Sequence, residues 1–348
     1  MRVQAPKQLC MRTVIAIPPM PRMTGGIAVL YQLAARLNEC GFPVALAGVP
    51  EAPGLAELAG AVEVLPWGKS GEGMKLHAKD RLVVPEGWPN LMAPALTASA
   101  KISVYVQNWA YLFSALPEGV LWQKLPVTFL AVSQPVGWFI EHLSGLPVDG
   151  IIRPAIDAAR FYPSPTPLQH ERIRIAWMPR KNRGLAEQIR QIATALLAAR
   201  DTALRLEWVE IHGMTPDQVA ETLRTCHIFL ATGFPEGCPL PPLEAMASGC
   251  FVVGFAGFGG WDSMRQARSG RYVPRIRLRD VPWGGNGLFA ADGDVVEAAQ
   301  SLVETIGIFL DNPQEYLDVL TAAQATAASY SIAAQREEAR AVWLRYAV

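Results

Sequence analysis

HIFLATGFPEGCPLPPLEAMASGCFVVGF, from His227 to Phe255, predicts a strand, a turn, a short helix and a second strand in unbroken succession. The segments His227–Ala231 and Phe251–Phe255 have the length and the apolar content of buried strands. Pro241 and Pro242 lie where the helix would begin, and the start of a helix tolerates proline. Strand, helix and strand in this order form the repeating unit of a parallel α/β sheet.

The same alternation extends through most of the chain. Further predicted strands are Thr13–Ile17, Val44–Ala47, Leu82–Val84, Ile102–Val106, Val127–Val132, Ile151–Ile152, Ile173–Met178 and Leu204–Ile211. Predicted helices are Ile27–Cys40, Val136–Leu143, Leu185–Ala199, a helix introduced by the capping box Thr215–Gln218, and the C-terminal Val295–Leu310, Pro313–Ser329 and Ala333–Tyr346. The pattern favours a doubly wound parallel sheet of the α/β class.

A chain of 348 residues exceeds the usual size of one hydrophobic core, so two domains are expected. Periodicity is lost in a proline-rich stretch, which marks a linker at residues 153–170. The predicted organisation is a first domain at residues 1–152, a second domain at residues 171–330, and a final helix at residues 331–348.

Composition limits the partners of the chain. Lysine plus arginine and aspartate plus glutamate number 31 each, so no net charge attracts nucleic acid or anionic lipid. Five dispersed cysteines without a CxxC pair suit the reduced thiols of a cytosolic protein. No run of 18 apolar residues occurs, and Val14–Ile17 is too short for a signal peptide. We expect a cytoplasmic protein that does not bind nucleic acid, and leave peripheral contact with the inner face of a membrane and the oligomeric state open.

Two loops that follow predicted strands could approach an anion. Gly25 and Gly26 open the first helix, where their backbone amides could contact a ligand, although two glycines can equally make a tight turn. In the second domain, Arg180, Lys181 and Arg183 precede a helix. Three cations oppose the dipole at a helix N-terminus, and a bound anion would resolve that conflict. A solvated basic turn is the alternative interpretation.

The two glutamates of the opening stretch form a third candidate. Glu236 lies in the turn and Glu244 in the following helix, so the two carboxylates could contact opposite ends of one ligand. A carboxylate can accept two hydrogen bonds from a ribose diol, and a second carboxylate can stabilise positive charge that develops on a sugar. Alternatively, Glu244 could favour the N-terminus of its own helix.

The remaining motifs are weaker indications of function. Asp292-Gly293-Asp294 has the DxD spacing of metal-dependent sugar transferases, but it precedes a helix and is interpreted as its N-cap. Neither an HExxH nor a GxSxG motif is present. Trp109, Tyr111 and Phe113 follow a strand and are expected to pack in a core or interface rather than to line an acceptor pocket.

The stretch that contains Glu236 and Glu244 resembles the retaining glycosyltransferases of family 4, which have the GT-B fold. EGCPLPPLEAMASG, residues 236–249, is similar to the E-x7-E signature of that family. Weaker similarity covers the glycine pair Gly25-Gly26, the interdomain stretch Pro154–Pro163, and NGL at residues 286–288. The resemblance implies two Rossmann-like domains facing across a cleft, the first binding acceptor and the second binding donor, with the last helix packed back on the first domain.

The resemblance also implies roles for individual residues. Glu244 would bind the ribose hydroxyls of a sugar nucleotide and Glu236 would face the donor sugar, while Arg180 with Lys181 or Arg183 would hold the diphosphate. The remaining implied contacts are Gly237, Cys238, Leu240, Gly25 and Gly26 for the donor, and Gln107, Asn108 and Trp109 for the acceptor. The expected reaction is retaining transfer of a hexose-type unit to a glycan, a lipid-linked glycan or a small molecule. No cofactor and no metal are expected.

The chain departs from the family at several positions. MPRKNRG is compressed relative to the usual spacing of the two cations, and Pro239 cannot donate a backbone hydrogen bond. Gln107 and Asn108 replace the histidine of the first domain, and Trp261-Asp262 stands where the family has a carboxylate motif. Alternative interpretations are therefore a silent nucleotide-sugar binding subunit, or an epimerase or phosphorylase with the same fold.

Overall fold

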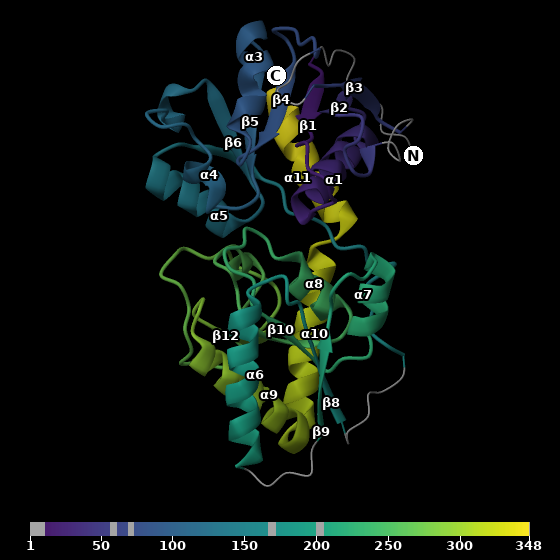
Figure 1. The fold of residues 1–348 in the computed structure, drawn as a ribbon, viewed down its shortest axis with the longest axis vertical. Coiled ribbons are helices and arrows are strands. Elements are labelled where there is room, and N and C mark those ends of the chain that lie inside the picture. The colour runs from purple at the N-terminus through teal and green to yellow at the C-terminus, as the bar shows by residue number, and fades with distance from the viewer. Residues whose placement is uncertain (1–10, 56–60, 69–72, 166–171, 200–204, 348) are drawn as a thin grey trace. The chain divides into compact units, whose positions relative to one another are not determined.

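The chain folds into two compact units in a computed structural model (Figure 1). One unit consists of Met1–Ala155 and Ile332–Val348, and the other of Ile156–Ser331. The boundary between the units lies within the predicted linker, of which residues 166–170 are outside the described part of the chain. The residues that the structure describes are 11–55, 61–68, 73–165, 172–199 and 205–347.

The first unit contains a seven-stranded parallel sheet in the order β3-β2-β1-β4-β5-β6-β7. Its strands are β1 Thr13–Ala16, β2 Val44–Gly48, β3 Glu63–Pro66, β4 Arg81–Pro85, β5 Lys101–Val106, β6 Val127–Ala131 and β7 Val148–Ile151. Its helical segments are α1 Gly25–Glu39, η1 Pro89–Met92, α3 Ala93–Ala98, α4 Tyr111–Ser114, η2 Trp122–Lys124, α5 Gln134–Phe139, η3 Ile140–Ser144 and α11 Ile332–Tyr346. The strand β3 was not predicted, because this edge strand is partly exposed and lacks an apolar run.

The C-terminal helix α11 completes the first unit, where it lies beside α1 (Figure 1). The buried indole of Trp343 donates from Nε1 to the Thr13 hydroxyl at 2.7 Å. The Tyr346 hydroxyl donates to the Asp149 carboxylate at 2.7 Å, and the Arg81 guanidinium lies 3.5 Å from the centre of the Tyr346 ring. The last 17 residues are therefore an integral part of the first unit.

The second unit contains a five-stranded parallel sheet in the order β12-β11-β10-β8-β9. Its strands are β8 Arg172–Trp177, β9 Arg205–Glu210, β10 Ile228–Ala231, β11 Phe251–Phe255 and β12 Gly287–Ala290. Its helical segments are α6 Arg183–Ala198, α7 Pro216–Leu223, α8 Leu240–Ala247, η4 Gly259–Asp262, α9 Val295–Asp311 and α10 Pro313–Ser329. The strand β12 was not predicted, because it has four residues and begins with glycine.

Both faces of this second sheet are covered. Ile228 and Leu230 of β10 contribute to a core with α6 and α9, whereas Phe229 and Ala231 contribute to a core with α7 and α8. Side chains alternate between faces along a strand, so burial on both sides produces the continuous apolar runs of the sequence.

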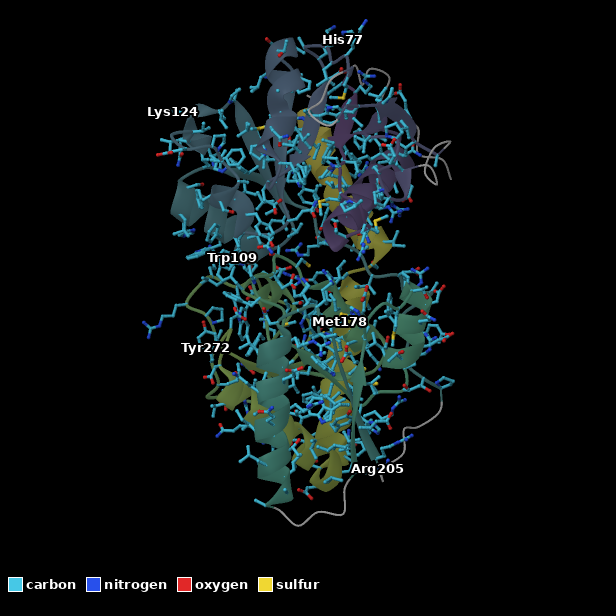
Figure 2. The ribbon with its side chains drawn as sticks, in the orientation of Figure 1. His77, Trp109, Lys124, Met178, Arg205 and Tyr272 are labelled. Carbon is cyan, nitrogen blue, oxygen red and sulfur yellow. The ribbon has the colours of Figure 1, made fainter. Side chains whose placement is uncertain are left out.

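Parallel strands bring all their carboxyl ends to one edge of a sheet. Figure 2 shows Met178, directly after β8, and Arg205, the first residue of β9, at opposite ends of the second unit. The strand order reverses between β8 and β10 in this unit, and between β1 and β4 in the first unit. Ligands of open α/β sheets bind in the crevice at such switch points.

Candidate functional site

The loops after β8 and β10 are joined at the switch point of the second unit. The Asn182 side chain donates from Nδ2 to the carbonyls of Thr232 at 2.8 Å and of Phe234 at 3.1 Å. The Thr232 hydroxyl donates to the Lys181 carbonyl at 2.6 Å. Asn182 adopts a left-handed φ of 59°, which asparagine tolerates better than most residues. These bonds hold the predicted cationic loop against the loop of Glu236.

The structure separates the three predicted cations. Lys181 pairs with the Glu236 carboxylate across the switch point. Arg183, which begins α6, is exposed and engaged by Glu210 at 2.8 Å and by Glu187 at 3.3 Å. Arg180 is exposed and has no ion-pair partner among the described residues. Arg180 therefore has a free charge for an anion, whereas Lys181 and Arg183 are each already paired with carboxylates.

The backbone of Glu236 is bracketed by the turn that follows β11. Its amide donates to the Gly257 carbonyl at 2.9 Å, and its carbonyl accepts from the Gly259 amide at 3.0 Å. A side chain at position 257 would place its Cβ 2.6 Å from the Glu236 Cβ, and one at position 259 would lie 1.9 Å from the Gly237 carbonyl. Only glycine permits this close approach.

Glu244 is the fifth residue of α8 and lies in its second turn. The helix dipole acts mainly within the first turn, so the alternative role at the helix N-terminus loses support. No hydrogen-bond donor contacts the Glu244 carboxylate among the residues that the structure describes. Burial raises its pKa to about 7, although the Arg160 charge acts in the opposite direction. A half-buried carboxylate without a donor is suited to receiving hydroxyl groups from a ligand.

Proline limits what α8 can offer an anion. Pro239 is the N-cap residue, and Pro241 and Pro242 occupy the second and third helical positions. None of the three has a backbone N–H, so Leu240 supplies the one amide of the first three helical positions. Any anion at this site depends on side-chain cations more than on the helix end. A small cavity of about 20 Å³, lined in part by Lys181, lies beside these prolines.

The first unit has a polar group of its own at its switch point. Gly25 and Gly26 begin α1, and a Cβ at position 26 would lie 2.7 Å from Gln107 Oε1. Gln107 Nε2 is buried, and none of the described residues accepts a hydrogen bond from it. Glu86, only 4% exposed, accepts from the amides of Gln107 at 2.9 Å and Asn108 at 2.8 Å. Burial raises the pKa of Glu86 to about 7.

Sequence reasoning missed Glu86. The signal was present, because Glu86 follows directly after the strand β4, at the ligand-binding edge of a parallel sheet. The acidic group thus holds the loop in which Gln107 and Asn108 were predicted to contact an acceptor.

The three aromatic residues that follow β5 differ in how far they are buried. Trp109 is half-buried, and its ring centre lies 5.3 Å from that of Phe139. Phe113 also contacts Phe139, but its side chain remains 46% exposed, and that of Tyr111 remains 52% exposed. Tyr111 and Phe113 are therefore not buried in the core of the first unit, and packing of these residues at an interface stays a prediction.

The aspartates of the DxD motif have separate structural roles. Asp294 caps α9 by accepting from the Glu297 amide at 3.0 Å, which confirms the N-cap prediction. Asp292 instead accepts from the Gly257 amide at 2.7 Å. The described residues contain no group of three or more potential metal ligands among His, Cys, Asp and Glu. They also contain no helix that is long and apolar enough to cross a membrane.

Comparison with known proteins agrees with this architecture. Residues 183–306 match the family model described as "Glycosyl transferases group 1". An "Alpha-1,6-glucosyltransferase" of Actinobacillus pleuropneumoniae serotype 7 is 34% identical over 205 residues, which is 58% of this chain. The match spans 60% of the length of that relative.

Two solved structures resemble nearly the whole chain. The sucrose-phosphate synthase of Thermosynechococcus elongatus and the Anabaena protein HepE, the latter in complex with UDP and glucose, each have a TM-score of 0.67 at 12% identity. Each alignment covers 96% of this chain and 99% of the other. The two parallel-sheet units and these neighbours identify the fold as GT-B. Glu236 and Glu244 both lie in the segment that matches the group 1 glycosyltransferase model.

Proposed function

We propose that this protein is a retaining glycosyltransferase that moves a hexose-type unit from a nucleotide diphosphate sugar to an acceptor hydroxyl. The proposal rests on the Lys181–Glu236 pair at the β8/β10 switch point and on the Glu244 carboxylate of α8, which no donor among the described residues contacts. The match to the group 1 model and the glucosyltransferase relative support the same activity.

Each residue has a distinct task in the proposed reaction. Glu244 accepts the two ribose hydroxyls, while Arg180 and Lys181 neutralise the diphosphate. The bond between the anomeric carbon and the phosphate oxygen breaks, and the acceptor oxygen bonds to the same face of that carbon. The acceptor proton passes to the departing phosphate. Glu236 lies beside the sugar and stabilises its developing positive charge.

The donor and its diphosphate contacts can be tested with a panel of sugar nucleotides, beginning with UDP-glucose because a structural neighbour contains UDP and glucose. The wild-type protein should release nucleoside diphosphate from at least one of them. Replacing both Arg180 and Lys181 by alanine should reduce that release by at least about 100-fold, because the leaving diphosphate loses two positive charges that would stabilise it. Arg190→Ala, on the exposed face of α6, is the matched control and should retain full activity.

Retention and metal independence require separate measurements. Proton NMR of the product should give the same anomeric configuration as the donor, and an inverted product would reject the front-face mechanism. Turnover should be unchanged in excess EDTA, because Arg180 and Lys181 supply positive charge to the leaving group. The proposed acceptor is a glycan, a lipid-linked glycan or a small molecule. The proposed location is the cytoplasm, either free or in peripheral contact with the inner face of a membrane.

A silent nucleotide-sugar binding subunit is the second candidate. It is favoured by the three prolines at the start of α8, which leave few backbone donors for a phosphate. Such a protein would bind the nucleotide without releasing diphosphate from any donor. Release that disappears in the Arg180/Lys181 double variant would exclude it.

A further inference from the structure

The turn that brackets Glu236 has an unusual backbone. Phe258 has φ 68° and ψ −63°, and the Gly259 amide donates to the Gly257 carbonyl at 3.0 Å. These dihedrals and this bond define a γ-turn with Phe258 at its centre, a rare and strained conformation for a residue with a side chain. Such strain persists only where surrounding contacts determine the backbone.

One side-chain contact that holds this turn comes from Asp292, between β12 and α9. Its carboxylate accepts from the Gly257 amide at 2.7 Å and also from the Phe258 amide. Burial raises the pKa of Asp292 to about 6 in spite of these two bonds. Burying a carboxylate is costly, and capping of α9 does not require it, because Asp294 already provides the cap.

The γ-turn also fixes the position of Glu236. Glu236 donates to the Gly257 carbonyl and accepts from the Gly259 amide, so both of its backbone groups are bonded to the turn. Its side chain then reaches Lys181 in the β8–α6 loop. A continuous series of hydrogen bonds leads from Asp292 through residues 257–259 to the carboxylate of Glu236.

We propose that Asp292 is a positioning residue that holds Glu236 in place against the donor sugar by fixing the Gly257–Gly259 γ-turn. This role rests on the proposed function and gives the first aspartate of the DxD motif a task other than metal binding. It predicts that Asp292 affects the chemical step while leaving nucleotide binding, assigned to Glu244, unchanged.

The first arm of the test needs no knowledge of the donor. Hydrogen exchange of the whole protein should show faster exchange in segments 233–239 and 256–260 for Asp292→Ala than for the wild type, because the turn loses the two hydrogen bonds that its backbone amides donate to Asp292. Asp294→Ala is the matched control, two residues away, and should affect only the start of α9. Unchanged protection of segment 233–239 in Asp292→Ala would overturn the proposal whatever the donor is.

The second arm uses the sugar nucleotide that the wild-type protein hydrolyses or transfers. Asp292→Ala should lower kcat by about 10-fold, and Asp292→Asn, which keeps one acceptor oxygen, by about 3-fold. The dissociation constant of the nucleoside diphosphate should change less than about twofold, whereas a purely structural role would change the folded fraction but not kcat per folded molecule. In a Glu236→Gln background, adding Asp292→Ala should lower residual turnover by less than about twofold, because both changes act on one group.

The outcomes separate this proposal from the proposed function. Normal turnover in Glu236→Gln would reject the role of Glu236 itself, and with it the catalytic part of both proposals. Loss of turnover in Glu236→Gln together with wild-type kcat in Asp292→Ala would reject the positioning role alone. A full 10-fold further loss in the double variant would show that Asp292 acts through a group other than Glu236.

Discussion

Glu244 is the residue of the second unit that we propose binds the ribose, and its carboxylate titrates near neutral pH. Because burial raises its pKa to about 7, much of the free protein carries the protonated form at pH 6 and the ionised form at pH 8. The ribose hydroxyls donate best to the ionised form, so affinity for UDP-glucose should rise by up to about tenfold between pH 6 and pH 8. The diphosphate of UDP-glucose does not change its protonation state between pH 6 and pH 8.

Calorimetric titration across this pH range would check the dependence. Glu244→Gln should bind weakly at every pH and show no comparable rise. A wild-type affinity that is flat or falls with pH would contradict the assignment of Glu244 to the ribose.

At the residue scale, the sequence predicted the groups but not their partners. Glu236 and Glu244 were identifiable from the motif around them, and the cations from their place after a strand. That Lys181 pairs with Glu236 whereas Arg183 is engaged by Glu210 follows from loop geometry that local pattern cannot specify. Local pattern also could not specify the hydrogen-bond partners of Glu86, because they lie 21 and 22 residues further along the chain.

At the scale of elements, Gly254 sets how closely β10 and β11 approach each other. It has φ 122°, and an added Cβ would lie 2.1 Å from the Ala231 carbonyl. Gly254→Ala should therefore destabilise the second unit by more than about 3 kcal/mol in urea denaturation. Gly270→Ala is the control, because Gly270 also has a positive φ but no atom within 4 Å of the added Cβ. That change should cost only about 1–2 kcal/mol, and equal losses would contradict the steric argument.

The loop after β5 depends on Glu86 in a pH-dependent way. Its pKa is raised from 4.5 to about 7 in the folded protein, so the folded state binds the proton more tightly than the unfolded state. The stabilising contribution is complete below pH 4.5 and is lost as the pH rises through 7, by about 3 kcal/mol in total. Urea midpoints should thus fall less with pH in Glu86→Gln than in the wild type. Parallel pH profiles would reject this account.

Elements with continuous apolar runs were predictable, and the others were not. The strand β10 and the helix α10 follow directly from hydrophobic pattern and capping residues. The edge strand β3 exposes part of its surface, and β12 starts with a glycine whose role is close contact with the Val252 carbonyl. The strand β3 is held by pairing with β2, and β12 by pairing with β11, which is a tertiary effect rather than a local propensity.

At the scale of the whole molecule, the chain leaves the second unit at Ser331 and ends in the first. Trp343 is fully buried there, so Trp343→Ala should destabilise the first unit by about 3–5 kcal/mol. Trp343→Phe keeps most of the packing and loses the bond to Thr13, and should cost about 1 kcal/mol. Hydrogen exchange should increase in β1 and α1. Unaltered protection of both elements would contradict the packing of α11 in this unit.

We propose that the β8/β10 switch point of the second unit binds the nucleotide of a sugar nucleotide. Calorimetric titration of the wild-type protein with UDP, ADP, GDP and TDP should identify one nucleotide that binds with micromolar affinity. Glu244→Ala should weaken that binding by about 10- to 100-fold, because the ribose loses two hydrogen bonds to a charged group. Glu221→Ala, an exposed glutamate on α7, should bind as the wild type does. Equal affinity of Glu244→Ala and the wild type would contradict the claim.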